Sequence, residues 1–131
     1  MRKYLFLLLT MIIFVVLNAE SRPQILFEKA MSAQNEEMIS KLKQLSVNYS
    51  DSLYGQKAML ELGKIYLLQR DYSKAISELK KIYLSQISEK EFWLAKAYLQ
   101  AGENRNAIVS AQNFISDSDD FSKIEECLFI I

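Results

Sequence analysis

Histidine is absent from the 131-residue sequence, and cysteine occurs once, at Cys127. Without histidine the chain cannot form a Ser–His or Cys–His nucleophile pair, nor an ordinary zinc site with imidazole ligands. A single cysteine cannot form an internal disulfide, so we expect Cys127 to be a small apolar core residue, with an intermolecular bridge as the alternative. Proline occurs once and glycine three times. Because strand-rich folds need many tight turns, this scarcity favours an all-α fold.

The chain also has no excess of positive or negative charge. Lysine and arginine together number 16, and aspartate and glutamate together also number 16. A neutral chain has no long-range field that would hold nucleic acid. The sequence also has neither a glycine-rich phosphate loop nor a nucleophile elbow. We therefore expect no enzymatic activity, no cofactor, no metal, no small-molecule substrate and no nucleic acid. The catalytic alternative is a carboxylate-based enzyme of the cell envelope.

The first 21 residues have the order of a secretory signal peptide. A positive start at residues 1–3 precedes the uncharged, mostly apolar run 4–17, and small or polar residues follow at 18–21. The run is shorter than the roughly 20 residues that a membrane-spanning helix needs. We therefore expect segment 1–21 to be removed by cleavage after Ala19 or Ser21, and the protein to be exported to the periplasm. The alternative is an uncleaved anchor that holds the protein in the inner membrane through residues 4–17.

From residue 24 onward, apolar residues recur at helical spacing between short polar breaks. The sequence predicts an all-α domain over residues 22–131, with helices over 24–33, 36–47, 53–68, 72–84, 89–101, 104–115 and 121–131. The last of these carries an apolar stripe that includes Phe121, Ile124 and Leu128, and no partner helix follows it. Either the repeat domain is incomplete at its C-terminus, or this helix caps it.

Two of the expected helix pairs superpose at a shift of 32 residues. Each contains a leucine, a small residue and a tyrosine, then a turn and an alanine. The matching residues are Leu62 with Leu94, Gly63 with Ala95, Tyr66 with Tyr98, Ala75 with Ala107, and Ile82 with Phe114. The small residue lets the two helices of a pair approach closely. Such a pair cannot bury its apolar face alone, so successive pairs are expected to stack into a solenoid.

The pattern resembles the tetratricopeptide repeat, whose period is about 34 residues. The two copies lie within residues 56–115, and the second has Gly102 in the turn where the first has Arg70. The resemblance implies an antiparallel helix-pair solenoid of about three repeats that binds other proteins.

A narrower resemblance lies in segment 45–58, whose centre reads Tyr-Ser-Asp-Ser-Leu-Tyr-Gly. It is similar to the linker of bacterial periplasmic tetratricopeptide proteins, such as the Tol–Pal coordinator and the outer-membrane-assembly lipoproteins. Those proteins usually carry Tyr-Pro-x-Ser there, and Ser50 stands where their proline would be. This resemblance implies a protein of the bacterial cell envelope.

The first helices of such pairs line the inner surface of a solenoid, and here they carry a repeated strip at i, i+4 and i+7. Six residues of this strip form the candidate partner-binding site: Leu60, Lys64, Leu67, Phe92, Lys96 and Leu99. The apolar members would hold an extended or helical peptide, and each lysine would pair with an acidic group. The alternative is that the strip packs against neighbouring repeats.

The expected function is a non-catalytic protein–protein interaction scaffold of the cell envelope that binds a partner peptide or domain in its groove. The alternative is a membrane-anchored envelope assembly factor that keeps its N-terminal helix, with membrane contact only through that segment.

Overall fold

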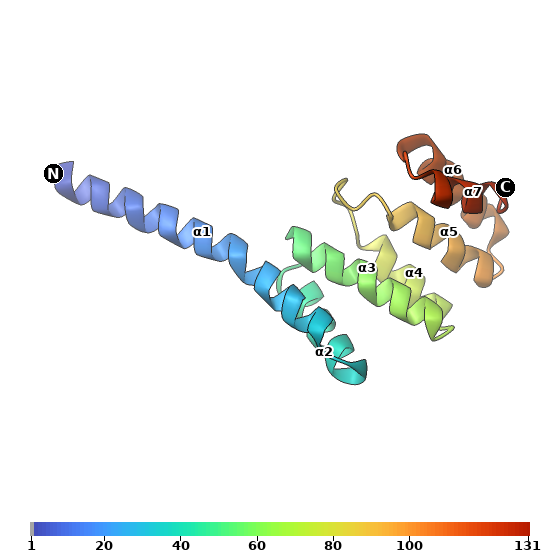
Figure 1. Ribbon diagram of the computed structural model, residues 1–131, viewed down its shortest axis with the longest axis horizontal. Coiled ribbons are helices and arrows are strands. Elements are labelled where there is room, and N and C mark those ends of the chain that lie inside the picture. The colour runs from blue at the N-terminus through green and yellow to red at the C-terminus, as the bar shows by residue number, and fades with distance from the viewer. Residues whose placement is uncertain (1) are drawn as a thin grey trace.

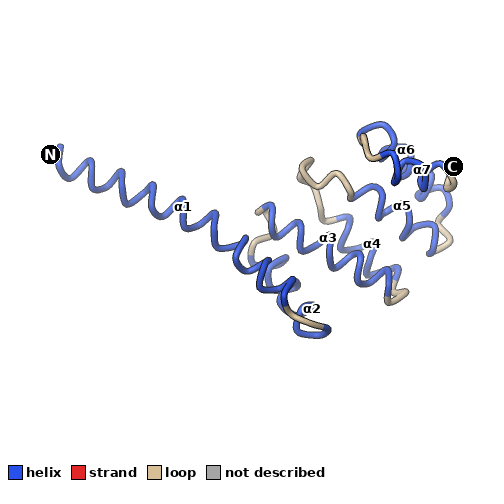
Figure 2. The backbone as a smooth tube through the Cα atoms, in the orientation of Figure 1, coloured by secondary structure: helices blue, strands red, loops and turns tan. Residues whose placement is uncertain are grey.

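The computed structural model describes residues 2–131, with the side chains of Arg2 and of residues 17–21 outside that description. The described chain folds into seven helices and no strand, which confirms the expected all-α class (Figure 2). The helices are α1 (Arg2–Ser32), α2 (Asn35–Asn48), α3 (Leu53–Leu68), α4 (Tyr72–Lys80), α5 (Lys90–Gln100), α6 (Asn104–Asp117) and α7 (Phe121–Leu128).

The helices form two layers (Figure 1). Consecutive helices pack against one another, and each odd-numbered helix also contacts the next odd-numbered one. The even-numbered helices make no such contacts with one another in the described part of the chain. Because α1, α3, α5 and α7 lie closer together than α2, α4 and α6, they form the inner layer of a curved stack. These packed helix pairs have the arrangement expected of a tetratricopeptide-like solenoid.

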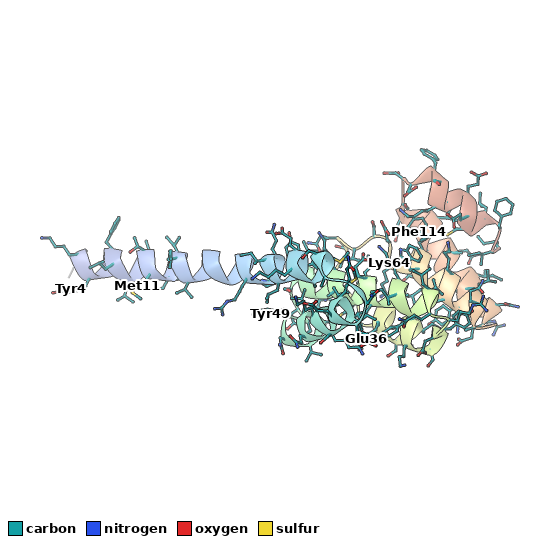
Figure 3. The ribbon with its side chains drawn as sticks, turned by 60° about the horizontal axis from the view of Figure 1, so that its bottom comes forward. Tyr4, Met11, Glu36, Tyr49, Lys64 and Phe114 are labelled. Carbon is teal, nitrogen blue, oxygen red and sulfur yellow. The ribbon has the colours of Figure 1, made fainter. Side chains whose placement is uncertain are left out.

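Helix α1 is much longer than the helix expected at 24–33, and only its second half joins the stack (Figure 3). There Ala30 is fully buried, and the ring of Phe27 lies 5.8 Å from that of Tyr54 in α3. The side chains of residues 3–16 are exposed, and the labelled Tyr4 and Met11 stand clear of the stack. Among the described residues, no helix is long and apolar enough to cross a membrane.

No break in the helix marks the expected domain boundary near residue 22, because α1 continues through Pro23. A proline inside a helix lacks the N–H that would bond to the preceding turn. Pro23 is buried, and this burial of apolar surface offsets part of the loss. The expected cleavage junction at residues 18–21 falls on side chains outside the description, so the signal segment stays a prediction.

The two central helix pairs repeat at the expected shift of 32 residues, including the hydrogen bonds of their turns. After α3 the amide of Asp71 donates to the carbonyl of Tyr66, and after α5 the amide of Glu103 donates to the carbonyl of Tyr98, both at 2.9 Å. The residue before each donor has a positive φ, 61° in the first turn and 79° in the second. The two turns therefore share one backbone geometry.

Small residues set the spacing within each pair, as the repeat pattern predicts. A Cβ added at Gly63 would lie 2.5 Å from Cγ of Leu79, so any larger residue there would force the side chain of Leu79 to shift. In the second pair, Ala95 and Ala111 hold the equivalent positions, and both are fully buried. A glycine–leucine pair in one repeat and an alanine–alanine pair in the next therefore fill equivalent spaces.

Helix α4 ends at Lys80, earlier than the expected end at residue 84. The cause is Gln56 of α3, which is fully buried. Its Oε1 accepts hydrogen bonds from the backbone amides of Tyr83, at 3.0 Å, and Leu84, at 2.9 Å. Its Nε2 donates to the carbonyl of Ser50 at 3.2 Å. Because these amides are satisfied by a side chain from another helix, the chain leaves helical geometry at this point.

Helix α7 closes a second buried cluster, and it is shorter than the expected range 121–131. Cys127 is fully buried there with a free thiol, as expected of a core cysteine. Burial raises the pKa of this thiol, which further lowers its reactivity. Phe121 and Leu128 of the apolar stripe stay exposed, so only part of the stripe packs against α5 and α6.

Candidate protein-binding groove

A groove of about 670 Å³ lies beside the C-terminal ends of α3 and α5. These helices run in the same direction in the inner layer (Figure 1). Side chains of α7 and of the residues after it also line the groove. The lining residues come from four helices and two turns: Leu67, Leu68, Arg70, Tyr72, Trp93, Lys96, Leu99, Gln100, Glu126, Phe129 and Ile130. Stacking of the inner helices is therefore what creates this concave site.

Large, solvent-exposed apolar side chains from α3, α5 and the residues after α7 line the groove. Leu68 at the end of α3 is 84% exposed, and Phe129 just after α7 is 86% exposed. Leu99 of α5 is also exposed, and Tyr72 and Trp93 add aromatic surface. Exposed apolar patches with a polar rim mark interaction sites on soluble proteins, and aromatic anchors often dominate their binding energy.

The charged side chains of the groove are only partly compensated. The ammonium of Lys96 pairs with the carboxylate of Glu126 at 2.8 Å. It also lies 5.0 Å from the ring centre of Phe92 and 5.4 Å from that of Trp93. These contacts hold Lys96 in place and tie α7 to α5. Arg70 is the other cation of the lining, and no ion pair forms at its guanidinium within the described residues.

The structure brings three of the six expected site residues to the groove: Leu67, Lys96 and Leu99. The expectation that Leu60 and Phe92 form part of an open strip is corrected, because they are only 7% and 2% exposed. Leu60 belongs to the main core, and Phe92 packs 5.5 Å from Phe114. Phe92 therefore packs within its own helix pair, and neither residue forms part of an open surface.

Lys64 is not among the groove residues, although it belongs to α3 of the same inner layer. Its ammonium pairs with Glu61 at 2.8 Å and with Glu89 at 3.7 Å. Lys64 and Lys96 therefore already have acidic partners in this chain, and their pairing with an acidic group of a ligand stays a prediction. Both lysines neutralise carboxylates of this chain.

Glu89 joins three of the inner helices, α3, α5 and α7. Its carboxylate accepts a hydrogen bond from Nε1 of Trp93 at 2.9 Å and pairs with Lys123 of α7 at 3.4 Å. Burial acts to raise the pKa of Glu89, but the hydrogen bond from Trp93 and the charges of Lys64 and Lys123 outweigh it, and the pKa lies below its usual value. The ionised carboxylate therefore helps to hold α3, α5 and α7 in register.

Sequence reasoning missed several lining residues, chiefly Leu68, Arg70 and Phe129. They lie at or beyond helix ends, where helical periodicity no longer assigns a residue to a face. One signal was present for Leu68, which is a large apolar residue immediately before the polar turn residues 69–71.

The pair α3–α4 has the geometry of a known repeat. Residues 57–84 match the family model of the tetratricopeptide repeat. The matched tetratricopeptide segment contains the Gly63–Leu79 contact and the turn at Arg70. The match supports the family-level resemblance, and it does not bear on the narrower resemblance to periplasmic proteins. Tetratricopeptide repeats generally mediate protein–protein interaction and are typically non-catalytic. No curated protein and no solved structure matches the chain.

Proposed function

We propose that the protein is a non-catalytic interaction scaffold that binds a segment of another protein in the groove between α3, α5 and α7. The observation that carries the proposal is the convergence of Leu68, Leu99 and Phe129 on one concave site. Burying such side chains is worth about 25 cal/mol for each Å² of apolar surface removed from water. A partner segment that covers them would gain this energy without displacing any core residue.

The test uses charge substitutions at side chains that are already exposed, so that the fold is preserved. Leu68→Glu combined with Phe129→Glu should abolish capture of partner proteins from an envelope extract, because an incoming apolar segment would have to desolvate two carboxylates. The matched control is Val47→Glu combined with Phe121→Glu, two equally exposed apolar residues outside the groove lining. Partner proteins retained by the groove variant but lost by the control would place binding elsewhere.

We further propose that the protein is exported to the bacterial periplasm and works in the cell envelope. The support is the charged, apolar and small-residue order of segment 1–21 and the resemblance of segment 45–58 to the linker of periplasmic tetratricopeptide proteins. Intact mass of the protein from the periplasmic fraction tests this proposal, with an expected loss of residues 1–19 or 1–21. A full-length mass in washed membranes would favour the membrane-anchored assembly factor instead.

A further inference from the structure

Arg70 occupies a backbone position where the neighbouring repeat has glycine. Its φ is 61°, in the left-handed region, and the equivalent Gly102 has φ 79°. A Cβ added at Gly102 would meet no atom within 4 Å. The turn therefore has room for a side chain, but its backbone geometry favours glycine.

The arginine is an unusual choice for this conformation. Left-handed geometry disfavours residues with a Cβ, and asparagine tolerates it better than most because its short polar side chain bonds locally. Asn35, the other non-glycine residue with positive φ in the described range, is of that tolerant type. Arg70 is not. Residues in such conformations occur often at functional sites, which makes the side chain of Arg70 a candidate for a functional role.

The guanidinium of Arg70 also forms no ion pair within the described chain. Its neighbour Asp71 pairs with Lys74 at 2.6 Å and caps α4. Glu126, the one carboxylate in the groove lining, pairs with Lys96. Two cations and one anion line the groove, so one positive charge stays uncompensated at its Arg70 side.

We propose that Arg70 binds a carboxylate of the protein segment that occupies the groove. The occupant is then a segment whose large apolar side chains cover Leu68, Leu99 and Phe129, with an aspartate or glutamate that meets Arg70. A guanidinium can hold a carboxylate through two parallel N–H···O bonds, which gives orientation as well as attraction. This inference rests on the proposed function, because it names the chemistry that the same groove recognises.

The test uses a display library of random peptides, selected in parallel on the full-length protein and on its Leu68→Glu/Phe129→Glu variant. Peptides enriched by the wild-type protein alone are groove binders, and synthetic copies of them are titrated against Arg70 variants. We expect these peptides to combine apolar residues with an aspartate or glutamate. Arg70→Gln should weaken their binding about tenfold, which is the effect of losing one charge-assisted hydrogen-bonded pair. Arg70→Lys, which keeps the charge but not the fork geometry, should weaken it less.

Two controls separate recognition from folding. A copy of each peptide with its carboxylate changed to the amide should bind the wild-type protein and Arg70→Gln equally. Arg70→Gly removes the side chain and relieves the backbone strain, so it should weaken peptide binding while the thermal midpoint stays unchanged or rises.

Groove binders that lack acidic residues, or whose affinity is the same for Arg70→Gln and wild-type protein, would overturn this inference and leave the proposed function intact. Selection that yields no peptide sensitive to Leu68→Glu/Phe129→Glu would overturn the proposed function as well.

Discussion

Gly63 is the point of closest approach between α3 and α4, and one methyl group there has a large expected effect. In Gly63→Ala the new Cβ would lie 2.5 Å from Cγ and 2.6 Å from Cδ2 of Leu79. Leu79 is fully buried and has little room to move. We expect a loss of about 1–3 kcal/mol in the free energy of unfolding, even though alanine is the better helix former. Thermal melting followed by circular dichroism should show a midpoint lower by several degrees.

The second repeat supplies the control for this prediction. Ala95 and Ala111 stand where the first repeat has Gly63 and Leu79. In a Leu79→Ala background, Gly63→Ala reproduces that alanine–alanine pair and should cost much less than in the wild-type protein. Equal costs in the two backgrounds would mean that Leu79 is not the obstacle.

Gln56 stabilises the fold through the hydrogen bonds of its side chain, whereas Gly63 does so by its small size. Gln56→Leu keeps most of the volume but leaves the amides of Tyr83 and Leu84 without their acceptor. An unsatisfied amide costs about 1–3 kcal/mol when it is buried. Because these two hydrogen bonds are part-buried, we expect a loss of about 1–3 kcal/mol in total in urea unfolding. Gln112→Leu, at an exposed position of α6, is the control and should change stability by less than about 0.5 kcal/mol.

At the scale of the helix, Glu89 makes the register of the inner layer dependent on pH. Its pKa is lower in the folded protein than in the unfolded chain. Its stabilising effect is therefore present above the unfolded pKa, about 4.3, and is lost as the pH falls through the lower folded value. Glu89→Gln should cost less than about 1 kcal/mol at pH 7, because the carboxylate is partly exposed, and this cost should decrease as the pH falls through the folded pKa.

Urea unfolding of wild-type protein and Glu89→Gln across this pH range checks the prediction. Glu125→Gln is the control, since no ion pair forms at this exposed carboxyl within the described residues. A Glu89→Gln penalty that does not decrease as the pH falls would show that packing, rather than charge, holds the site together.

The bounds of a helix were predictable from the sequence where residues next to its ends determine them. The bounds of α3 agree with the sequence prediction because Ser52 caps its start and polar residues follow its end. The end of α4 was not predictable, because the acceptor that stops it is Gln56, 27 residues away from Tyr83. The unbroken α1 was not predictable either, because Pro23 normally marks a boundary.

The candidate site was predicted in part for a related reason. Helical spacing identifies residues that share a face, as it did for Leu67, Lys96 and Leu99. It does not say which stretch of that face a neighbouring helix covers. Leu60 and Phe92 lie where the inner helices pack against their neighbours and are buried, whereas the helix ends stay open. Burial depends on packing between repeats, and no window of sequence contains that information.

For the whole molecule, the division of α1 into an exposed half and a packed half predicts how the chain tolerates shortening. Removal of residues 1–21 takes away the exposed side chains 3–16 and leaves Phe27 and Ala30 against α2 and α3. We expect the shortened chain to melt within a couple of degrees of the full-length protein, as followed by circular dichroism, because no core contact of the described residues is lost.

Removal of residues 1–33 is the contrasting truncation. It uncovers Leu42 and Leu45 of α2, which are buried in the main core. Loss of a stacked neighbour in a solenoid costs the whole interface with the next repeat. We expect a marked drop in midpoint, and similar melting of the two truncated proteins would mean that α1 contributes nothing to the stack.

Trp93 gives the molecule an internal optical reporter. It is the single tryptophan of the sequence, and it lines the groove with its indole N–H bonded to Glu89. Its emission therefore reports on one place only, with no label attached. A segment that fills the groove displaces water from the indole, so the emission should shift to the blue and acrylamide should quench it less. Titration of the unlabelled protein with a binding segment would then give binding curves directly from the emission. The same emission would report the separation of α3, α5 and α7 when the protein unfolds.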